Sequence, residues 1–193
     1  MDRVKNKVAI VTGGASGLGE SSAILLAREG AKIVITDVDD ENGTKVVQDI
    51  NNDGGEAIFI KQDVSKEEEW KMVIETTIKT YGKLHIVANS AGIGIGGTVE
   101  DVTLDDWKNL INVNLHGTFL GTQYGIKGMK ETGEGGSIIN FSSIEGLIGD
   151  PNLPAYNASK GGVTIFTKSA ALHCAKQGYK IRVNSIHPAY IWT

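Results

Sequence analysis

Short apolar segments recur along the chain, separated by longer segments in which apolar residues follow the spacing of a helix. The short segments are rich in β-branched residues and almost continuously apolar, which is typical of parallel strands buried on both faces. We therefore predict a strand at each of them. They read KVAIVT from Lys7, KIVIT from Lys32, AIFIK from Ala57, LHIVA from Leu84, SIINF from Ser137 and IRVNSI from Ile181.

The longer segments predict helices between these strands. A first helix follows the first strand and is stopped by Gly30, and SKEEEW opens another, with Ser65 as its cap. Two long helices are expected over residues 103–130 and 154–178. Strand and helix alternate throughout residues 1–193 without a linker or repeat. The pattern therefore predicts a single α/β domain built on a doubly wound parallel sheet.

Two features near the first two strands predict a dinucleotide site. The first strand runs into TGGASGLGE, where Gly13, Gly17 and Gly19 allow unusual φ angles and close approach of a pyrophosphate to the helix N-terminus. The second strand ends in Asp37, 18 residues after Gly19. A carboxylate there can accept hydrogen bonds from the adenosine ribose and would repel the 2′-phosphate of NADP. These features favour NAD as the cofactor.

The same glycine-rich letters nearly fit two other motifs, and one residue excludes each of them. A phosphate-binding P-loop would need a lysine where Glu20 stands, and a carboxylate would repel the phosphates. A hydrolase nucleophile elbow around Ser16 would need glycine where Leu18 stands. We therefore reject an ATP or GTP site and a serine hydrolase.

The stretch AYNASKGG places Tyr156 and Lys160 four residues apart, which puts them on one face of the second long helix. Free tyrosine has a pKa of ~10, and a nearby ammonium favours the phenolate. Lowering this pKa to ~7 takes ~4 kcal/mol, part of which one lysine can supply. Such pairs are common on exposed helices, so the pair alone carries no function, and its context decides.

In that context the chain resembles the short-chain dehydrogenase/reductase family over its whole length. The signals that carry the resemblance occur in the order TGGASGLG, Asp37, DV at Asp63 and Val64, NSAG from Asn89, NVN ending in Asn114, SS ending in Ser143, and YNASK. The stretches SSIEGLIGDPNLPAYNASKGG and RVNSIHPAYIWT look like the R-specific secondary alcohol and cyclopentanol dehydrogenases of that family. The resemblance implies a Rossmann-type sheet flanked by helices.

The resemblance also implies a catalytic tetrad and a reaction. Tyr156 would be the general acid/base on the substrate oxygen, and Lys160 would lower its pKa and bind the nicotinamide ribose. Ser143, which precedes Tyr156 by 13 residues, would hold the substrate oxygen, and Asn114 would position a water in a proton relay to Lys160. The expected activity is NAD-dependent interconversion of a secondary alcohol and a ketone.

Further contacts follow from the same resemblance. Asp63 and Val64 would contact adenine, and Asn89 would support the sheet beside the ribose. The full expected cofactor set is Gly13, Ser16, Gly17, Leu18, Gly19, Asp37, Asp63, Val64, Asn89, Ala91, Gly92, Tyr156, Lys160, Pro188, Ile191 and Thr193. The expected substrate set is Gly94, Ser143, Glu145, Leu147, Leu153, Tyr156 and Tyr190, although core packing explains each leucine nearly as well.

The chain departs from the family at Ser90, usually asparagine, and at Ala189, usually glycine. Beyond the position of Thr193 the family continues with a substrate-covering loop, a helix and a seventh, edge strand. We therefore expect residues 1–193 to be a C-terminally incomplete catalytic domain that lacks the last strand and the substrate loop.

The composition of the chain limits the classes of binding partner to be expected. The net charge of −4 and pI of about 5.6 argue against a broad nucleic-acid or anionic-membrane surface. We expect no membrane segment, a cytoplasmic location and, by the resemblance, a homotetramer. The single cysteine, Cys174, excludes an intramolecular disulfide and a multi-cysteine metal site, and no metal is expected. The rival hypotheses are a non-catalytic NAD(H)-binding regulatory protein and a purely structural α/β module.

Overall fold

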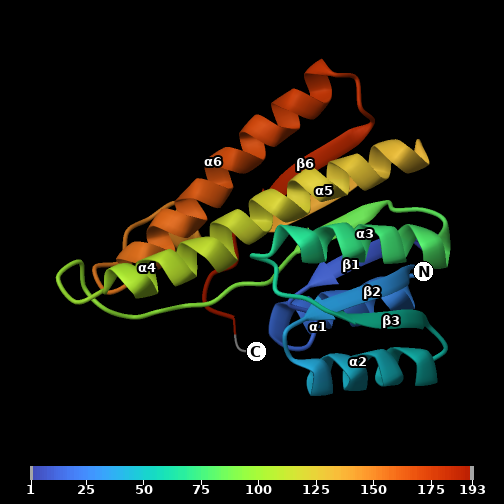
Figure 1. Cartoon of the computed structure of the whole chain (residues 1–193), viewed down its shortest axis with the longest axis horizontal. Helices are drawn as coiled ribbons and strands as arrows, with labels where there is room; N and C mark the ends of the chain where they lie inside the picture. The colour runs from blue at the N-terminus through green and yellow to red at the C-terminus, as the bar shows by residue number, and fades with distance from the viewer. Residues whose placement is uncertain (1, 192–193) are drawn as a thin grey trace.

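Parallel strands form one sheet in the computed structural model, which describes residues 2–191 (Figure 1). They are β1 (Val8–Thr12), β2 (Lys32–Asp37), β3 (Glu56–Lys61), β4 (Ile86–Asn89), β5 (Gly136–Phe141) and β6 (Ile181–Ile186). Their order across the sheet is β3-β2-β1-β4-β5-β6, and every neighbouring pair is parallel. The predicted doubly wound sheet is confirmed, and its strand order reverses between β1 and β4.

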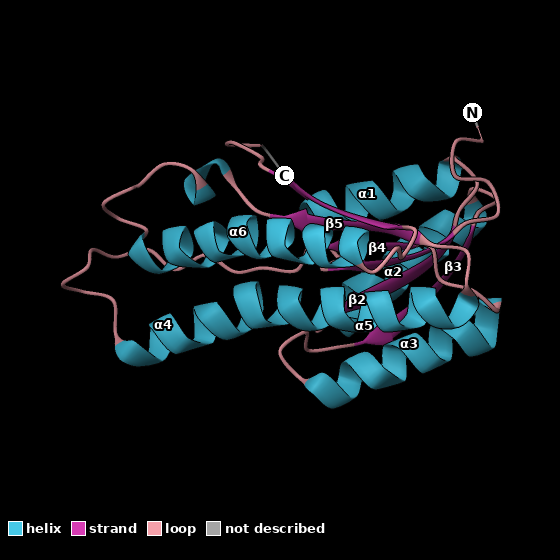
Figure 2. Ribbon diagram, turned by 90° about the horizontal axis from the view of Figure 1, so that it is seen from above, coloured by secondary structure: helices cyan, strands magenta, loops and turns pink. Residues whose placement is uncertain are grey.

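Helices cover both faces of the sheet (Figure 2). They are α1 (Gly17–Arg28), α2 (Asp40–Asn52), α3 (Glu67–Tyr81), α4 (Leu104–Ile111), α5 (Gly117–Thr132) and α6 (Pro154–Lys176). On one face Trp70 of α3, Tyr124 of α5 and Cys174 of α6 share a buried cluster with strand residues, and Cys174 lies in the core as expected. Ala23 of α1 and Val46 of α2 pack on the other face. None of the helices within residues 2–191 is long and apolar enough to cross a membrane.

The edge strand β6 differs from the sequence-based expectation. Ile181 and Val183 are buried, whereas Arg182 and Asn184, which alternate with them, are exposed. Within residues 2–191, α6 packs against one face of this strand and its other face meets solvent. The prediction of burial on both faces is therefore wrong for β6, which alternates as a half-covered strand does.

Two helix predictions also need correction. The expected single helix over residues 103–130 has α4 and α5 joined by a π-helical turn, Asn112–His116, although the two run as one rod in Figure 1. Ser65 does not cap α3, because that helix begins two residues later and the Ser65 hydroxyl bonds to the Asp63 carboxylate at 2.7 Å. The acidic residues of the first turn of α3 are present as predicted.

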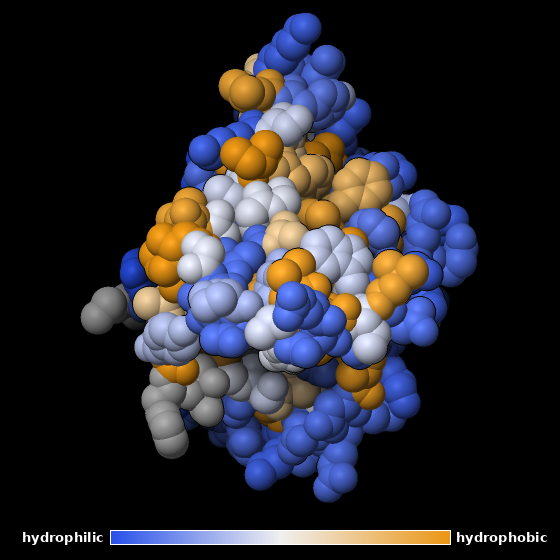
Figure 3. Space-filling view, turned by 90° about the vertical axis from the view of Figure 1, so that its left-hand side faces the viewer, coloured by the Kyte–Doolittle hydropathy of each residue, from blue (hydrophilic) through white to orange (hydrophobic). Residues whose placement is uncertain are grey.

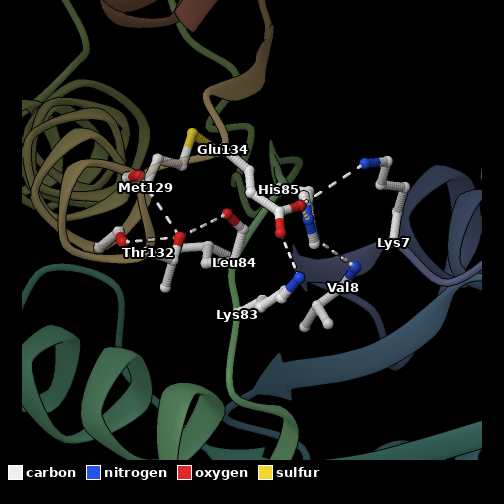
Figure 4. Close-up of polar contacts among 9 residues, drawn as sticks. Lys7, Val8, Lys83, Leu84, His85, Met129, Thr132 and Glu134 are labelled. Carbon is white, nitrogen blue, oxygen red and sulfur yellow. Dashed lines mark hydrogen bonds and ion pairs between the residues drawn. The ribbon is translucent and has the colours of Figure 1, made fainter. Parts of the chain in front are cut away.

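A polar cluster ties the sheet together at the amino ends of its strands (Figure 4). The buried His85 ring accepts the Val8 N–H at Nδ1 (3.0 Å), so its Nε2 carries the proton and donates to Glu134 (2.7 Å). The Glu134 carboxylate also pairs with Lys83 and lies 3.9 Å from Lys7. The hydrogen bonds from Lys83 and then from His85 lower the pKa of Glu134 to about 2. This cluster fastens β1 to β4 at the edge opposite the carboxyl ends.

Candidate active site

A cleft of about 650 Å³ lies at the carboxyl ends of the strands, where the strand order reverses between β1 and β4. Ligands of open α/β sheets bind at such a position, because the loops after the two neighbouring strands diverge there. The lining residues are Gly13, Ser16, Gly17, Leu18, Gly19, Asp37, Val38, Gln62, Asp63, Val64, Ser90, Ala91, Gly92, Ile93, Gly94, Val113, Phe141, Ser142, Ser143, Leu153, Tyr156, Lys160, Pro188, Ala189 and Ile191.

The turn from β1 into α1 brings backbone to the cleft wall with no side chain in the way. Gly13 has a φ of 64°, and a Cβ on it would lie 2.7 Å from the Ala91 Cα atom. A Cβ on Gly19 would collide with the Gly13 carbonyl oxygen. Because α1 begins at Gly17, its unpaired N–H groups and the positive end of its dipole lie at the cleft. These residues fit a pyrophosphate group.

Asp37 ends β2 and holds a fixed position at the cleft. Its carboxylate accepts backbone N–H groups from Ala15 and from Asp39, both at 3.1 Å. Among residues 2–191, Lys160 is the one basic side chain that lines the cleft. It donates to Phe141 at the end of β5, and β1 and β4 lie between that strand and β2, which carries Asp37. Apart from Lys160, the cleft lining within residues 2–191 therefore contains no arginine or lysine, and Lys61, opposite Asp37 in the β2–β3 register, is not part of it.

Ser143, Tyr156 and Lys160 meet in the same cleft. Ser143 follows β5 and precedes a short 3₁₀ turn, Ile144–Gly146, and its hydroxyl accepts the Glu145 N–H at 3.1 Å. Tyr156 lies in the first turn of α6, which opens with a proline, and Lys160 lies one turn later. Lys160 is 4% exposed, and its ammonium donates to the Phe141 carbonyl at 2.7 Å. Its nitrogen lies 5.5 Å from the centre of the Tyr156 ring.

The charges of this group bear on the expected role of Lys160, which was to supply part of the lowering of the Tyr156 pKa. Burial raises the pKa of Tyr156, the hydrogen bond with Ser143 opposes this, and the charge of Glu145 adds to it. Burial also lowers the pKa of Lys160 to about 8. The ammonium is engaged by the Phe141 carbonyl, so without a ligand the phenol stays protonated. The cleft therefore presents a neutral acid beside a desolvated cation.

Asn114 is fully buried in the π-helical turn, a feature frequent at functional sites. Its side chain accepts the Ile93 N–H at 2.8 Å and donates to the Ile93 carbonyl at 2.9 Å. A Cβ on Gly92 would lie 3.2 Å from the Asn114 oxygen and 3.5 Å from the Lys160 nitrogen. Asn114 thus fixes the loop after β4 beside Lys160, and its role in a water relay remains a prediction.

The structure places five predicted site residues outside the cleft lining: Asn89, Asn114, Glu145, Leu147 and Tyr190. Asn89 is buried beneath the cleft and donates to the Asn140 side chain at 2.8 Å. Glu145 is also buried, and its carboxylate accepts the Asn157 amide at 2.8 Å. The side chains of Leu147 and Tyr190 are exposed. Thr193 lies outside the described residues.

The model of the family described as short chain dehydrogenase matches residues 7–193. The chain belongs to the short-chain dehydrogenase family. This membership agrees with the glycine turn, the acid after β2 and the meeting of Ser143, Tyr156 and Lys160 in one cleft.

Similar members of the short-chain dehydrogenase family have named activities. The chain is 50% identical over its full length to an NADP-dependent (R)-specific alcohol dehydrogenase of Lentilactobacillus kefiri, of which it covers 76%. It is 41% identical to a cyclopentanol dehydrogenase of Comamonas testosteroni, covering 76% of that protein. A family crystal structure from Burkholderia phymatum in complex with NAD superposes with a TM-score of 0.95 at 30% identity, covering 99% of this chain and 68% of that one.

Several lining residues of this short-chain dehydrogenase escaped the sequence reasoning, namely Val38, Gln62, Ile93, Val113, Phe141 and Ser142. Val38 and Gln62 each adjoin a predicted cofactor residue at a strand end, so their position along the chain was a usable signal. Val113 carried no such signal, because it lies in the π-helical turn, which the sequence did not predict. The sequence identified the residues of the expected motifs but not the other residues that line the cleft between them.

Proposed function

We propose that this protein is an NAD-dependent oxidoreductase that interconverts a secondary alcohol and a ketone, with Tyr156 as general acid/base. The observation that carries the proposal is one cleft that holds Ser143, Tyr156 and Lys160 after β5 and Asp37 after β2. The glycine turn at α1 lies in the wall of the same cleft. A dinucleotide bound at the strand ends would be held by both groups.

The choice of NAD over NADP rests on Asp37. Its carboxylate, fixed by the N–H groups of Ala15 and Asp39, accepts ribose hydroxyls and repels a 2′-phosphate. The Lentilactobacillus relative is named NADP-dependent, whereas the Burkholderia structure contains NAD. Because relatives of both kinds exist, the preference of this chain depends on its own residues, and the acid at position 37 supports NAD.

The nicotinamide, when bound, supplies the site that accepts or donates hydride. The protein handles the proton and the geometry. In oxidation the Tyr156 oxygen takes the proton of the alcohol hydroxyl, and in reduction it returns the proton to the ketone oxygen. The Ser143 hydroxyl holds that oxygen, and the buried Lys160 charge favours the phenolate once the cleft is loaded.

Small and apolar residues favour a modest, uncharged substrate. Gly94 and Leu153 line the cleft beside the catalytic group, which suits the hydrocarbon arms of a secondary alcohol.

Apolar side chains also gather on the end of the molecule where α4 begins (Figure 3). Exposed examples in the segments around α4 are Val99, Leu104 and Trp107. Such exposure supports association of identical chains, which is part of the proposal.

A substrate panel tests the proposed function. The protein is mixed with NAD and a series of secondary alcohols, and the absorbance of reduced cofactor is followed. The proposal predicts turnover of at least one alcohol with NAD and weaker binding of NADP. Binding of NADH without turnover would favour a regulatory NAD(H)-binding protein instead. Absence of NADH binding, measured by fluorescence, would favour a purely structural module.

A further inference from the structure

The His187 side chain joins the end of β6 to the segment that carries Ser143. Its Nδ1 lies 3.1 Å from the Ser143 carbonyl oxygen, and its Nε2 lies 3.0 Å from the Ser185 hydroxyl. A carbonyl oxygen only accepts hydrogen bonds, so Nδ1 must carry a proton. In the neutral ring Nε2 is then bare and accepts from Ser185. The partner of each nitrogen thus fixes one tautomer.

The backbone around this contact explains why a side chain is used. The β5–β6 ladder continues past its last strand pair through Ser142 N–H to the Ile186 carbonyl (3.0 Å) and Ile144 N–H to the Pro188 carbonyl (2.9 Å). Pro188 has no N–H, so this residue donates nothing back to the segment. The His187 ring supplies a donor from the same strand end to the residue between Ser142 and Ile144.

We infer that His187 is a positioning residue for Ser143, an inference that rests on the proposed function. The Ser143 carbonyl accepts from the Gly146 N–H at 3.0 Å as well as from His187. Together these bonds fix the peptide plane that follows the Ser143 Cα atom, and the hydroxyl on that residue hydrogen-bonds Tyr156 and lies 3.5 Å from the Pro188 carbonyl. A small rotation of that plane moves the hydroxyl away from the substrate oxygen, and misplacements of this size lower turnover strongly. His187 itself is absent from the cleft lining and touches no reacting atom.

Two substitutions separate this role from general support of the strand end. An asparagine side chain carries its amide nitrogen on Cγ, as the imidazole carries Nδ1, so His187→Asn keeps a donor for the Ser143 carbonyl. His187→Gln places its amide one atom farther out, near the position of Nε2, and keeps only the contact with Ser185. We expect His187→Gln to lower kcat about tenfold, the effect of one lost hydrogen bond. His187→Asn should stay within about twofold of wild type, and neither variant should change KM for NAD.

The matched control is the same pair of substitutions at His173, an exposed residue whose ring meets the Tyr179 ring edge to face. Both control variants should keep the wild-type kcat. Thermal midpoints of all four variants are recorded with bound NADH. If the Asn and Gln variants at position 187 lose kcat equally, or if kcat follows the thermal midpoint, the positioning role is wrong.

A readout independent of turnover uses nitrogen NMR of the imidazole ring in the full chain with NADH. The inference predicts a protonated Nδ1 and, in the neutral ring, an unprotonated Nε2. A neutral ring with its proton on Nε2 would overturn the inference. If wild type turns over no secondary alcohol, the proposed function fails, and this measurement then decides the His187–Ser143 contact alone.

Discussion

Replacing Lys160 by methionine should stabilise the ligand-free protein while removing its activity. Burial lowers the pKa of this lysine from 10.5 to about 8. At ~1.4 kcal/mol per pKa unit, the charged side chain costs the folded state ~3 kcal/mol near neutral pH. Methionine fills a similar volume without charge. It leaves the Phe141 carbonyl without its 2.7 Å partner, which costs about 1–2 kcal/mol. The net gain in the free energy of unfolding should be roughly 1–2 kcal/mol.

The dependence of stability on pH distinguishes the effect of the buried charge from a change in packing, which would not vary with pH. The folded-state pKa of Lys160, about 8, lies below the 10.5 of the unfolded chain. Between those values the unfolded chain binds more protons, so the stability of wild type rises with pH. Below about pH 8 the buried side chain is charged, and the full free-energy penalty of that charge is present. The advantage of Lys160→Met should therefore shrink by roughly 2 kcal/mol between about pH 7 and about pH 9.5.

Urea unfolding of both proteins near pH 7 and near pH 9.5 measures this difference, with midpoints and slopes compared. The control is Lys168→Met, because Lys168 is an exposed lysine on the same helix. That substitution should leave the gap to wild type independent of pH. A Lys160→Met protein that is less stable than wild type near pH 7, with a gap that does not change with pH, would refute the idea of a strained buried charge.

Two further predictions concern cofactor choice and acid stability. Asp37→Ser should weaken the preference for NAD over NADP by about tenfold, because the carboxylate that repels the 2′-phosphate is gone; dissociation constants of both cofactors measure this, and an unchanged ratio would rule out the assigned role. Lys83 and His85 lower the pKa of Glu134 from 4.5 to about 2, so its stabilising effect is present above about 4.5 and is lost as pH falls toward 2. Glu134→Gln should flatten the stability profile in that window, whereas Glu131→Gln, at an exposed glutamate of α5, should follow wild type; equal profiles for both variants would contradict the argument.

The sheet could be predicted because each of its strands carries a local signal. Apolar runs rich in β-branched residues marked all of the observed strands, from Val8–Thr12 to Ile181–Ile186. The exception was the burial of β6, where the exposed Arg182 and Asn184 already alternate with apolar residues. Strand identity is thus a local property of the sequence. Whether each face of a strand is buried depends on segments that are distant in the sequence and pack against it, so it cannot be predicted from the strand alone.

The candidate site was predictable by residue and less so by geometry. Tyr156 and Lys160 were predicted from their spacing together with the resemblance to the family, and the cleft contains both. The bond from Lys160 to the Phe141 carbonyl was not foreseeable, because it joins α6 to β5. The π-helical turn at Asn114 also left no signal in the periodicity. Asn114 in this turn is hydrogen-bonded to Ile93, a contact between residues 21 positions apart that the periodicity does not show.

The most direct test of the account is Tyr156→Phe, assayed for both turnover and NADH binding. The substitution removes one oxygen from a partly buried residue and keeps the packing of the ring. Loss of a positioned general acid/base should lower kcat by about 10²–10⁴-fold, while the dissociation constant for NADH stays within about twofold of wild type because the ring keeps its place. A phenylalanine variant whose kcat stays close to that of wild type would contradict the assignment of Tyr156 and with it the proposed mechanism.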